Sequence, residues 1–440
     1  MPQNDFYQVN EQGHLTVGEV DALDLAARFQ TPLVVYDVAN IRQQFQSFKQ
    51  AFSQQKVDYA ISYASKAFAS IAIYQVIDQL GGHLDVVSGG ELYTALRAGF
   101  PMSKVSFHGN NKSKSELLLA VQNQVGVIIL DNFYEIKLLA QVLEDTHTQI
   151  NVMLRVTPGV SAHTHKYIQT GQEDSKFGFD VRYGQAEEAL QQVLANKNMK
   201  LIGIHAHIGS QIMETAGFKL EVQKLMQMLK QWDQKYQYQA SVLNLGGGFG
   251  IRYTDHDRAL QPETFVEQIV QEVQKCVQQY NLKLPAIWIE PGRSIVGTAG
   301  YSLYTAGSYK KVPELLPYIA VDGGMGDNIR PALYQAEYQA LLARDPQAQP
   351  TETVHLAGRY CESGDILIEK ASLPEVNPGD IVAVLSTGAY GYSMASNYNR
   401  VPRPAVVFAE NGHAQEVIKR ETYDDLISHD CFYQEMRSNL

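Results

Sequence analysis

Short apolar runs recur along the first two thirds of the chain, and the segments between them are long enough to hold helices. Such runs, flanked by helical segments, are typical of buried parallel strands. Eight units of this kind suit a closed (β/α)8 TIM-like barrel, so we predict the α/β class, with an open doubly wound sheet as the alternative. The predicted strands lie around residues 58–63, 83–87, 104–108, 126–130, 150–156, 201–207, 242–245 and 286–290.

Two of the intervening segments carry clear helical patterns, at residues 186–196 and 214–236. In the second, apolar side chains recur at spacings of three and four, which predicts one buried face. We expect this face to be part of the core and not a cofactor site. Its members are Leu220, Val222, Leu225, Met226, Leu229 and Trp232.

Polar and glycine-rich residues follow the ends of the predicted strands. The carboxyl ends of barrel strands lie on one face, where barrel active sites are built. We therefore expect these residues to share one site. They are Ser65-Lys66, Ser88 to Glu91, His108 to Lys112, Asp131-Asn132, Arg155 to Gly159, His207 to Ser210, Gly246 to Gly250 and Glu290 to Arg293.

The two ends of the chain differ from its middle, because they contain short β-like runs broken by glycine, proline and asparagine. We predict a (β/α)8 barrel over residues 41–295 and a C-terminal β domain over residues 296–440. Residues 1–40 are expected to join the β domain. The run Leu33 to Tyr36 is the expected crossing into the barrel.

Composition narrows the class of protein. The 440 residues are 45% hydrophobic and 19% charged, enough apolar material for a large core. A net charge of −11 argues against nucleic acid or an anionic membrane as the partner. No leading basic and apolar segment and no run of roughly 18 apolar residues occurs, so we expect a cytoplasmic protein. The three cysteines have no metal-ligand spacing, and no metal is expected.

Lys66 is the main candidate for covalent chemistry, because it follows a predicted barrel strand. Three consecutive glycines, Gly246 to Gly248, leave backbone amides that can surround a phosphate. Glu290 ends another strand and could face a pyridine nitrogen. An amine, a phosphate cradle and a carboxylate together indicate pyridoxal 5'-phosphate, covalently bound through the lysine amine.

Each of these features has a simpler explanation. The glycines could form only a tight turn, and Glu290 could pair with Arg293. His205 and His207 are spaced two residues apart, as are His163 and His165. This spacing suggests a zinc site, although the sequence indicates no third ligand. A flat imidazole stacked on a cofactor ring is the better use of His207.

The chain resembles the diaminopimelate decarboxylases, pyridoxal-phosphate enzymes with an alanine-racemase-like barrel in the class-II ornithine, lysine and arginine decarboxylase group. The resemblance covers nearly the whole chain, with ten motifs in the family's order. They are Tyr63 to Ala67, His108 to Lys112, Ala162 to His165, Lys176 to Gly178, His205 to Ser210, Gly246 to Gly250, Glu290 to Ser294, Arg330 to Tyr334, Cys361 to Asp365 and Gly388 to Tyr390.

The resemblance implies a role for each matching residue. Lys66 would bind the cofactor, His207 would stack on its ring and Glu290 would face its nitrogen. The phosphate would be held by Ser210, Gly248, the amides near Gly292, and the side chains of Arg293 and Tyr390.

The substrate contacts are implied in the same way. Arg293, Arg330 and Tyr334 would hold the unreactive carboxylate of meso-2,6-diaminopimelate, near Tyr390, and Glu362 would hold its distal ammonium. Cys361 or Lys66 would return a proton after loss of carbon dioxide. In this family Cys361 and Glu362 come from the partner subunit, which implies a homodimer with shared sites.

Three other functions remain open. A decarboxylase of carboxynorspermidine, ornithine or arginine would keep the cofactor motifs and change the substrate contacts. A racemase would need a second acid and base, which the sequence does not reveal. A non-catalytic relative is disfavoured by intact Lys66, Cys361 and Glu362.

Overall fold

The computed structural model describes residues 7–160 and 175–433. The chain forms two compact units: Asp37–Gly300 with Leu385–Ser393, and Met1–Tyr36 with Tyr301–Val384 and Met394–Leu440. Residues 385–393 were expected in the β domain but group with the barrel. The physical reason is local, because Tyr390 N–H (2.8 Å) and the Ser393 hydroxyl (2.9 Å) both donate to the carbonyl of Ala67.

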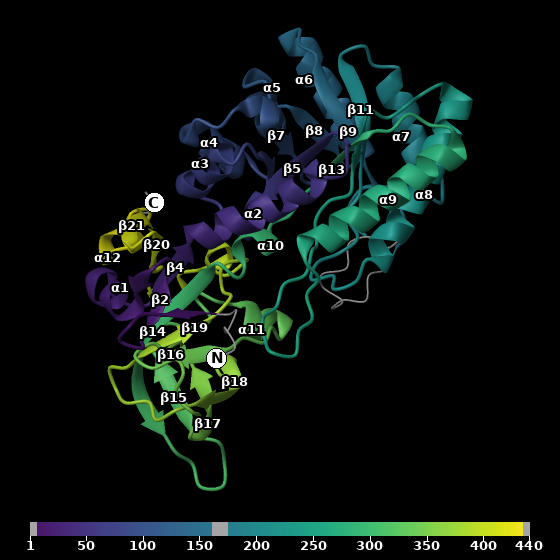
Figure 1. Ribbon diagram of the computed structural model, residues 1–440. Coiled ribbons are helices and arrows are strands. Elements are labelled where there is room, and N and C mark those ends of the chain that lie inside the picture. Colours follow the sequence, from purple (N-terminus) through teal and green to yellow (C-terminus); the bar gives the residue numbers. More distant parts are fainter. Residues whose placement is uncertain (1–6, 161–174, 434–440) are drawn as a thin grey trace, which may run out of the picture. The chain divides into compact units, whose positions relative to one another are not determined.

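The larger unit is a closed barrel of eight parallel strands, seen in Figure 1. Closure is shown by the pairing of β8 with β9, so the barrel prediction is confirmed and the open sheet is wrong. The strands, in barrel order, are β5 (Tyr59–Ala64), β6 (His83–Val86), β7 (Val105–Phe107), β8 (Val127–Leu130), β9 (Ile150–Thr157), β11 (Met199–His205), β12 (Val242–Asn244) and β13 (Ala286–Ile289), while the short β10 (Phe179–Asp180) adds to β9.

Helices fill the connections between these strands, and one more lies before the first strand and one after the last. They are α2 (Val38–Ser53), which precedes β5, α3 (Ile71–Gln79), α4 (Gly89–Ala98), α5 (Lys114–Gln122), α6 (Phe133–Thr146), α7 (Gln185–Leu194), α8 (Ala216–Tyr236), α9 (Pro262–Tyr280) and the short α10 (Arg293–Val296), which follows β13. Several begin after a serine or asparagine, residue types that commonly cap helices. Ser88, Ser113 and Asn132 each accept a hydrogen bond from the amide three residues on, so polar residues after the strands start the helices.

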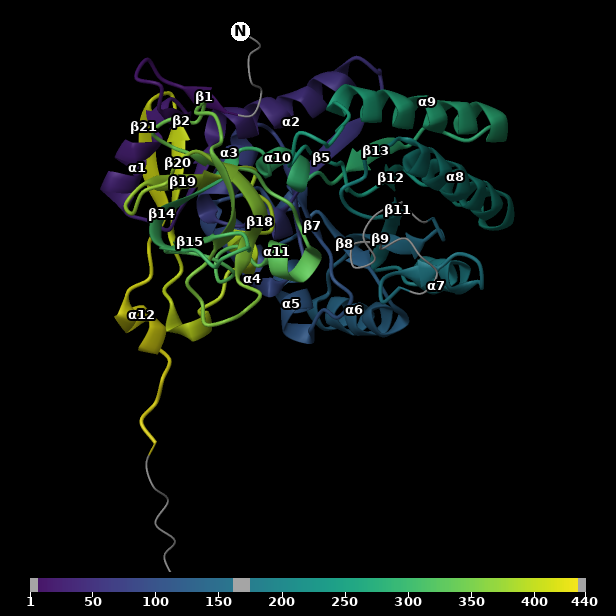
Figure 2. The same cartoon turned by 90° about the horizontal axis from the view of Figure 1, so that it is seen from below.

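Helix α8 lies beside α9 in both views (Figures 1 and 2). Its predicted apolar face is buried, with one exception: Leu220 is 44% exposed, so that assignment is wrong. The next residue, Glu221, is fully buried, and its carboxyl oxygens have no hydrogen-bond partner among the described residues. The buried face therefore keeps the other five predicted residues and includes Glu221 instead of Leu220.

The smaller unit is built on a second sheet in the order β18-β17-β15-β14-β4-β20-β21, with β19 paired to β14 and β16. Its strands are β4 (Leu33–Asp37), β14 (Gly300–Lys310), β15 (Tyr318–Val321), β16 (Ala340–Leu342), β17 (Glu352–Ala357), β18 (Ile366–Leu373), β19 (Ile381–Val384), β20 (Ala405–Glu410) and β21 (His413–Ile418). A small antiparallel sheet contains β1 (Gln8–Val9), β2 (Leu15–Val17) and β3 (Val20–Asp21), and the helices are α1 (Ala22–Phe29), α11 (Arg330–Tyr334) and α12 (Tyr423–Ile427).

The β character expected at both ends of the chain is therefore present, and β4 brings the N-terminal segment into the second sheet. Over residues 7–160 and 175–433, every helix is too short or too polar to cross a lipid bilayer.

Candidate active site

The interior of the barrel changes from apolar to polar along each strand. Side chains two residues apart share a face of a strand. Near the amino ends, Val127, Ile129, Met153 and Val242 form a buried apolar cluster. Two residues further along the same strands lie buried Asp131, Arg155 and Asn244. The carboxyl end of the barrel therefore concentrates polar groups above an apolar floor.

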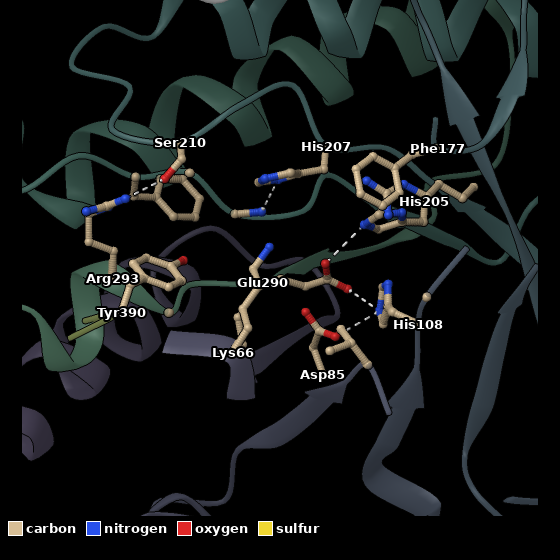
Figure 3. Close-up of a pocket in the computed structure, with 18 of the residues that line it drawn as sticks. Lys66, Asp85, His108, Phe177, His205, His207, Ser210, Glu290, Arg293 and Tyr390 are labelled. Atoms are coloured by element: carbon tan, nitrogen blue, oxygen red, sulfur yellow. Dashed lines mark hydrogen bonds and ion pairs between the residues drawn. The ribbon is translucent and has the colours of Figure 1, made fainter. Parts of the chain in front are cut away.

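Arg155 and other polar groups at this end line a cavity of about 350 Å³ in the barrel unit. Every residue expected to hold the cofactor lies on its wall: Lys66, His207, Ser210, Gly248, Glu290, Gly292, Arg293 and Tyr390. Figure 3 shows Ser210, Arg293 and Tyr390 toward one end and Glu290 with His108 toward the other. Lys66 and His207 lie between these ends.

Lys66 presents its amine to the cavity. It sits in a single 3₁₀ turn, Ser65–Ala67, whose other two residues are buried while Lys66 itself is exposed. Its side chain points into the space between His207 and Glu290 (Figure 3). An amine held by a buried turn and open to a cavity is suited to covalent chemistry with a carbonyl compound.

The imidazole of His207 is fixed by a backbone contact. The N–H of Gly247 donates to Nδ1 of His207 at 3.2 Å. Burial, followed by the positive charge of Lys66, lowers the pKa of His207 well below its usual value. The ring is therefore neutral, with its proton on Nε2, and is suited to lie flat against an aromatic ligand.

The glycine run is required by close packing. A Cβ on Gly247 would lie 2.1 Å from the carbonyl oxygen of Glu290, and one on Gly248 would lie 2.2 Å from that of Gly209. Gly246 and Gly248 also have φ values of +61° and +100°, which favour glycine. The glycines therefore do form a tight turn, as the simpler explanation held. In addition, Gly247 and Gly248 line the cavity.

Donors for an anion gather at one end of the cavity. Arg293 donates to the hydroxyl of Tyr253 and, at 3.0 Å, to that of Ser210. Its guanidinium lies 4.8 Å from the centre of the Tyr390 ring. Gly292 is confined because a Cβ there would lie 2.9 Å from that of Ala64.

Glu290 is held by neutral and imidazole donors, so the expected alternative of pairing with Arg293 is wrong for the described residues. Its Oε1 accepts from the Asn244 amide (2.7 Å) and lies 3.0 Å from Nε2 of His108. Its Oε2 lies 3.0 Å from Nε2 of His205. His108, His205 and Glu290 each offer one atom that could ligate a metal ion, and these three atoms lie within 4.8 Å of one another. His163 and His165 lie outside the described residues.

Several cavity residues were not assigned a role from the sequence. Asp85, Asn110, Arg155 and Phe177 line it, and Arg155 stacks its guanidinium 4.2 Å from the Phe177 ring. Strand-end position was a usable signal for Arg155. For Asp85, inside β6, no signal existed, because the inward face of a strand is known only once the barrel is closed.

Of the expected substrate residues, Arg293 and Tyr390 line the barrel cavity, and the β unit contains Arg330, Tyr334 and Glu362. Buried Arg330 opens α11, where Nε donates to Tyr338 (3.0 Å) and the guanidinium lies 5.2 Å from the Tyr334 ring. Cys361 and Glu362 are exposed in the turn before β18. The amide of Cys361 donates to Asn399 at 2.9 Å, which holds this turn in place.

The cavity fits pyridoxal phosphate. The open amine of Lys66 suits its aldehyde, and the neutral ring of His207 suits its aromatic ring. The buried carboxylate of Glu290 suits its pyridine nitrogen, and the donors at Ser210 and Arg293 suit its phosphate.

Comparison with known proteins agrees with this geometry. Residues 38–297 match the pyridoxal binding domain of pyridoxal-dependent decarboxylases. The chain is 56% identical to the diaminopimelate decarboxylase of Bacillus subtilis over 421 residues, 96% of each chain. It is 47% identical to that of Staphylococcus aureus, covering 96% of this chain and 98% of the other.

Solved structures show the same likeness. The diaminopimelate decarboxylase of M. jannaschii in complex with L-lysine has a TM-score of 0.91 and 32% identity, covering 98% of this chain and 99% of the other. On this likeness, which spans both units, the chain belongs to the diaminopimelate decarboxylase family of pyridoxal-dependent enzymes.

Proposed function

We propose that this protein is a carboxy-lyase that converts meso-2,6-diaminopimelate to L-lysine and carbon dioxide with pyridoxal 5'-phosphate, the last step of lysine biosynthesis. The observation that carries the proposal is the joint presence of an open lysine amine, a buried carboxylate and an anion-binding end in one cavity of a chain of this family.

Within this proposal, the cavity residues bind and orient the cofactor. Lys66 forms the covalent link, and the neutral ring of His207 packs against the face of the cofactor. Ser210, Gly248, Gly292, Arg293 and Tyr390 hold the phosphate, which is supported by the donors at that end of the cavity. When bound, pyridoxal phosphate supplies an electron-accepting ring that stabilises the charge left by departing carbon dioxide.

The role of Glu290 in this proposal is electrostatic. Burial alone would raise its pKa, but the imidazoles of His108 and His205, which face its two oxygens, hold the pKa well below its usual value. An ionised carboxylate at this end can accept a hydrogen bond from a protonated pyridine nitrogen.

The far end of the substrate would be bound by residues of the β unit together with Arg293 of the barrel. Arg330, Tyr334 and Arg293 are assigned to its unreactive carboxylate, and Glu362 to its ammonium. The exposed positions of Cys361 and Glu362 support their contribution to a partner's site, so we infer a homodimer. Cys361 or Lys66 then delivers the proton to the α-carbon. The cytoplasmic location and the domain boundaries near residues 40 and 295 remain parts of this proposal, whereas residues 385–393 group with the barrel.

The direct test is an assay of the purified protein with meso-diaminopimelate, scoring lysine and carbon dioxide. Ornithine, arginine and carboxynorspermidine serve as comparison substrates. Release of one carbon dioxide per lysine supports the proposal. Faster turnover of any comparison substrate would replace the assigned substrate and leave the cofactor chemistry in place.

A further inference from the structure

The carboxylate of Glu290 lies inside a buried set of four side chains. Glu290, His205 and His108 are respectively 6%, 1% and 4% exposed, and Asn244 is fully buried. These groups come from β7, β11, β12 and β13 or the residues just after them. Three neighbouring strands, β11, β12 and β13, and the more distant β7 thus contribute to the surroundings of one anion.

Two of the contacts to Glu290 have a fixed direction. Asn244 accepts from the N–H of Gly246 at 3.0 Å, so its amide nitrogen must be the atom that faces Glu290. Burial is the main cause that lowers the pKa of His205, to about 4. A neutral imidazole facing a carboxylate must carry its proton on the facing nitrogen, so His205 donates from Nε2.

His108 stands in a different environment. Its Nε2 lies 3.0 Å from Glu290 and 3.6 Å from Asp85. Burial lowers the pKa of His108, but the negative charges of Asp85 and Glu290 outweigh both burial and nearby Arg155, so the pKa is raised. The rings of His108 and His205 are 4.8 Å apart and nearly perpendicular. The pKa values of the two imidazoles that flank the carboxylate are therefore shifted in opposite directions.

We propose that His205 and His108 are positioning residues that act through Glu290. His205 orients the carboxylate with a fixed N–H donor. His108, whose Nε2 lies 3.0 Å from Glu290 and 3.6 Å from Asp85, favours the ionised form of the Glu290 carboxylate. That Glu290 contacts the cofactor rests on the proposed function. The contacts of Glu290 with His205, His108 and Asn244 are seen in the structure and do not depend on it.

The orientation part is tested with two substitutions of His205. His205→Gln keeps an N–H donor at similar reach, and His205→Leu removes it. We expect His205→Leu to lower kcat about 10-fold, the loss that corresponds to about 1.4 kcal/mol, with little change in KM. It should also shift the visible absorption band of the bound cofactor. His205→Gln should keep most of the wild-type kcat and a nearly unshifted absorption band. The control His256→Leu, at an exposed position, should change neither kcat nor the band.

The charge part is tested in the protein freed of cofactor. Histidine-selective NMR should show one imidazole, identified by its loss in His108→Gln, whose pKa lies above the usual value of about 6.5. Asp85→Asn should lower its pKa. EDTA is present throughout, because His108, His205 and Glu290 could also ligate a divalent cation.

Two results would overturn the proposal. Equal kcat, KM and spectra for His205→Gln and His205→Leu would remove the orienting role, and a His108 pKa at or below the usual value of about 6.5 would remove the charge role. Failure of the wild-type protein to bind pyridoxal phosphate would instead refute the proposed function, while the NMR measurement would still decide the state of His108.

Discussion

The backbone of Gly247 passes so close to Glu290 that a Cβ at position 247 would lie 2.1 Å from the Glu290 carbonyl oxygen. Gly247→Ala must therefore push β13 or the glycine loop aside. We expect a loss of roughly 1–3 kcal/mol in unfolding free energy, typical of overpacking, together with weaker cofactor binding. Urea unfolding of the cofactor-free protein measures the first effect.

The matched control is Gly90→Ala in α4, where the nearest heavy atom to a new Cβ is the Ser88 hydroxyl at 3.7 Å. Because alanine is favoured over glycine in helices, this variant should be neutral or more stable by about 0.5–1 kcal/mol. Equal stability of the two variants would contradict the packing explanation.

Lys66→Ala should abolish the visible-edge absorption band that a lysine-bound pyridoxal phosphate gives. Borohydride should fix the cofactor to the wild-type protein, and peptide mass mapping should locate it on Lys66. Lys114→Ala, which changes a half-exposed lysine paired with Asp145, should retain the band. A reduced adduct on any other lysine would refute the assignment.

Glu221 should make the fold less stable as pH rises. Burial raises its pKa well above the usual value, so the folded state keeps a proton that the unfolded state releases above about pH 4.3. The folded state then binds more protons, and unfolding free energy falls by up to about 1.4 kcal/mol per pH unit between the two pKa values.

The measurement is urea unfolding from pH 4 to 8. Glu221→Gln, which cannot ionise, should become more stable relative to wild type as pH rises. Exposed Glu267→Gln should follow the wild-type curve. Parallel curves for wild type and Glu221→Gln would show that Glu221 does not retain its proton.

Arg330 and Glu362 should determine which amino acid is turned over. Removing either leaves a substrate charge unpaired, so Arg330→Ala and Glu362→Ala should each lower kcat/KM for meso-diaminopimelate about 10-fold or more. Arg344→Ala, which breaks a surface pair with Asp380, is the control in the same unit. Unchanged kcat/KM in Arg330→Ala would exclude its role.

Activity should require a dimer with shared sites. Lys66→Ala and Glu362→Ala are each expected to be inactive or severely impaired alone. In a mixed dimer both lesions fall in the same site, leaving the other intact, so random re-association should restore about a quarter of native activity. If confirmed heterodimers show no more activity than the separate variants, Glu362 must act within its own chain.

The sequence predicted the barrel well because each strand is a short apolar run between longer helical patterns. It predicted the cavity residues that follow strands, such as Lys66 and Glu290, for the same reason. It could not predict the partners of Glu290, because Asn244 and His205 belong to separate strands whose inward faces are set by barrel closure. Leu220 was misplaced because a small error in helical phase moves a residue at the edge of an apolar face into solvent.

The barrel unit is also discontinuous in sequence. Its chain leaves at Gly300 and returns only at Leu385–Ser393, bringing Tyr390 to the cavity wall and two donors to the carbonyl of Ala67, next to Lys66. A protein shortened to residues 37–300 would therefore lack part of its own cofactor pocket. Dissection of this enzyme into independently expressed halves must carry the 385–393 segment with the barrel, joined by a new linker in place of residues 301–384.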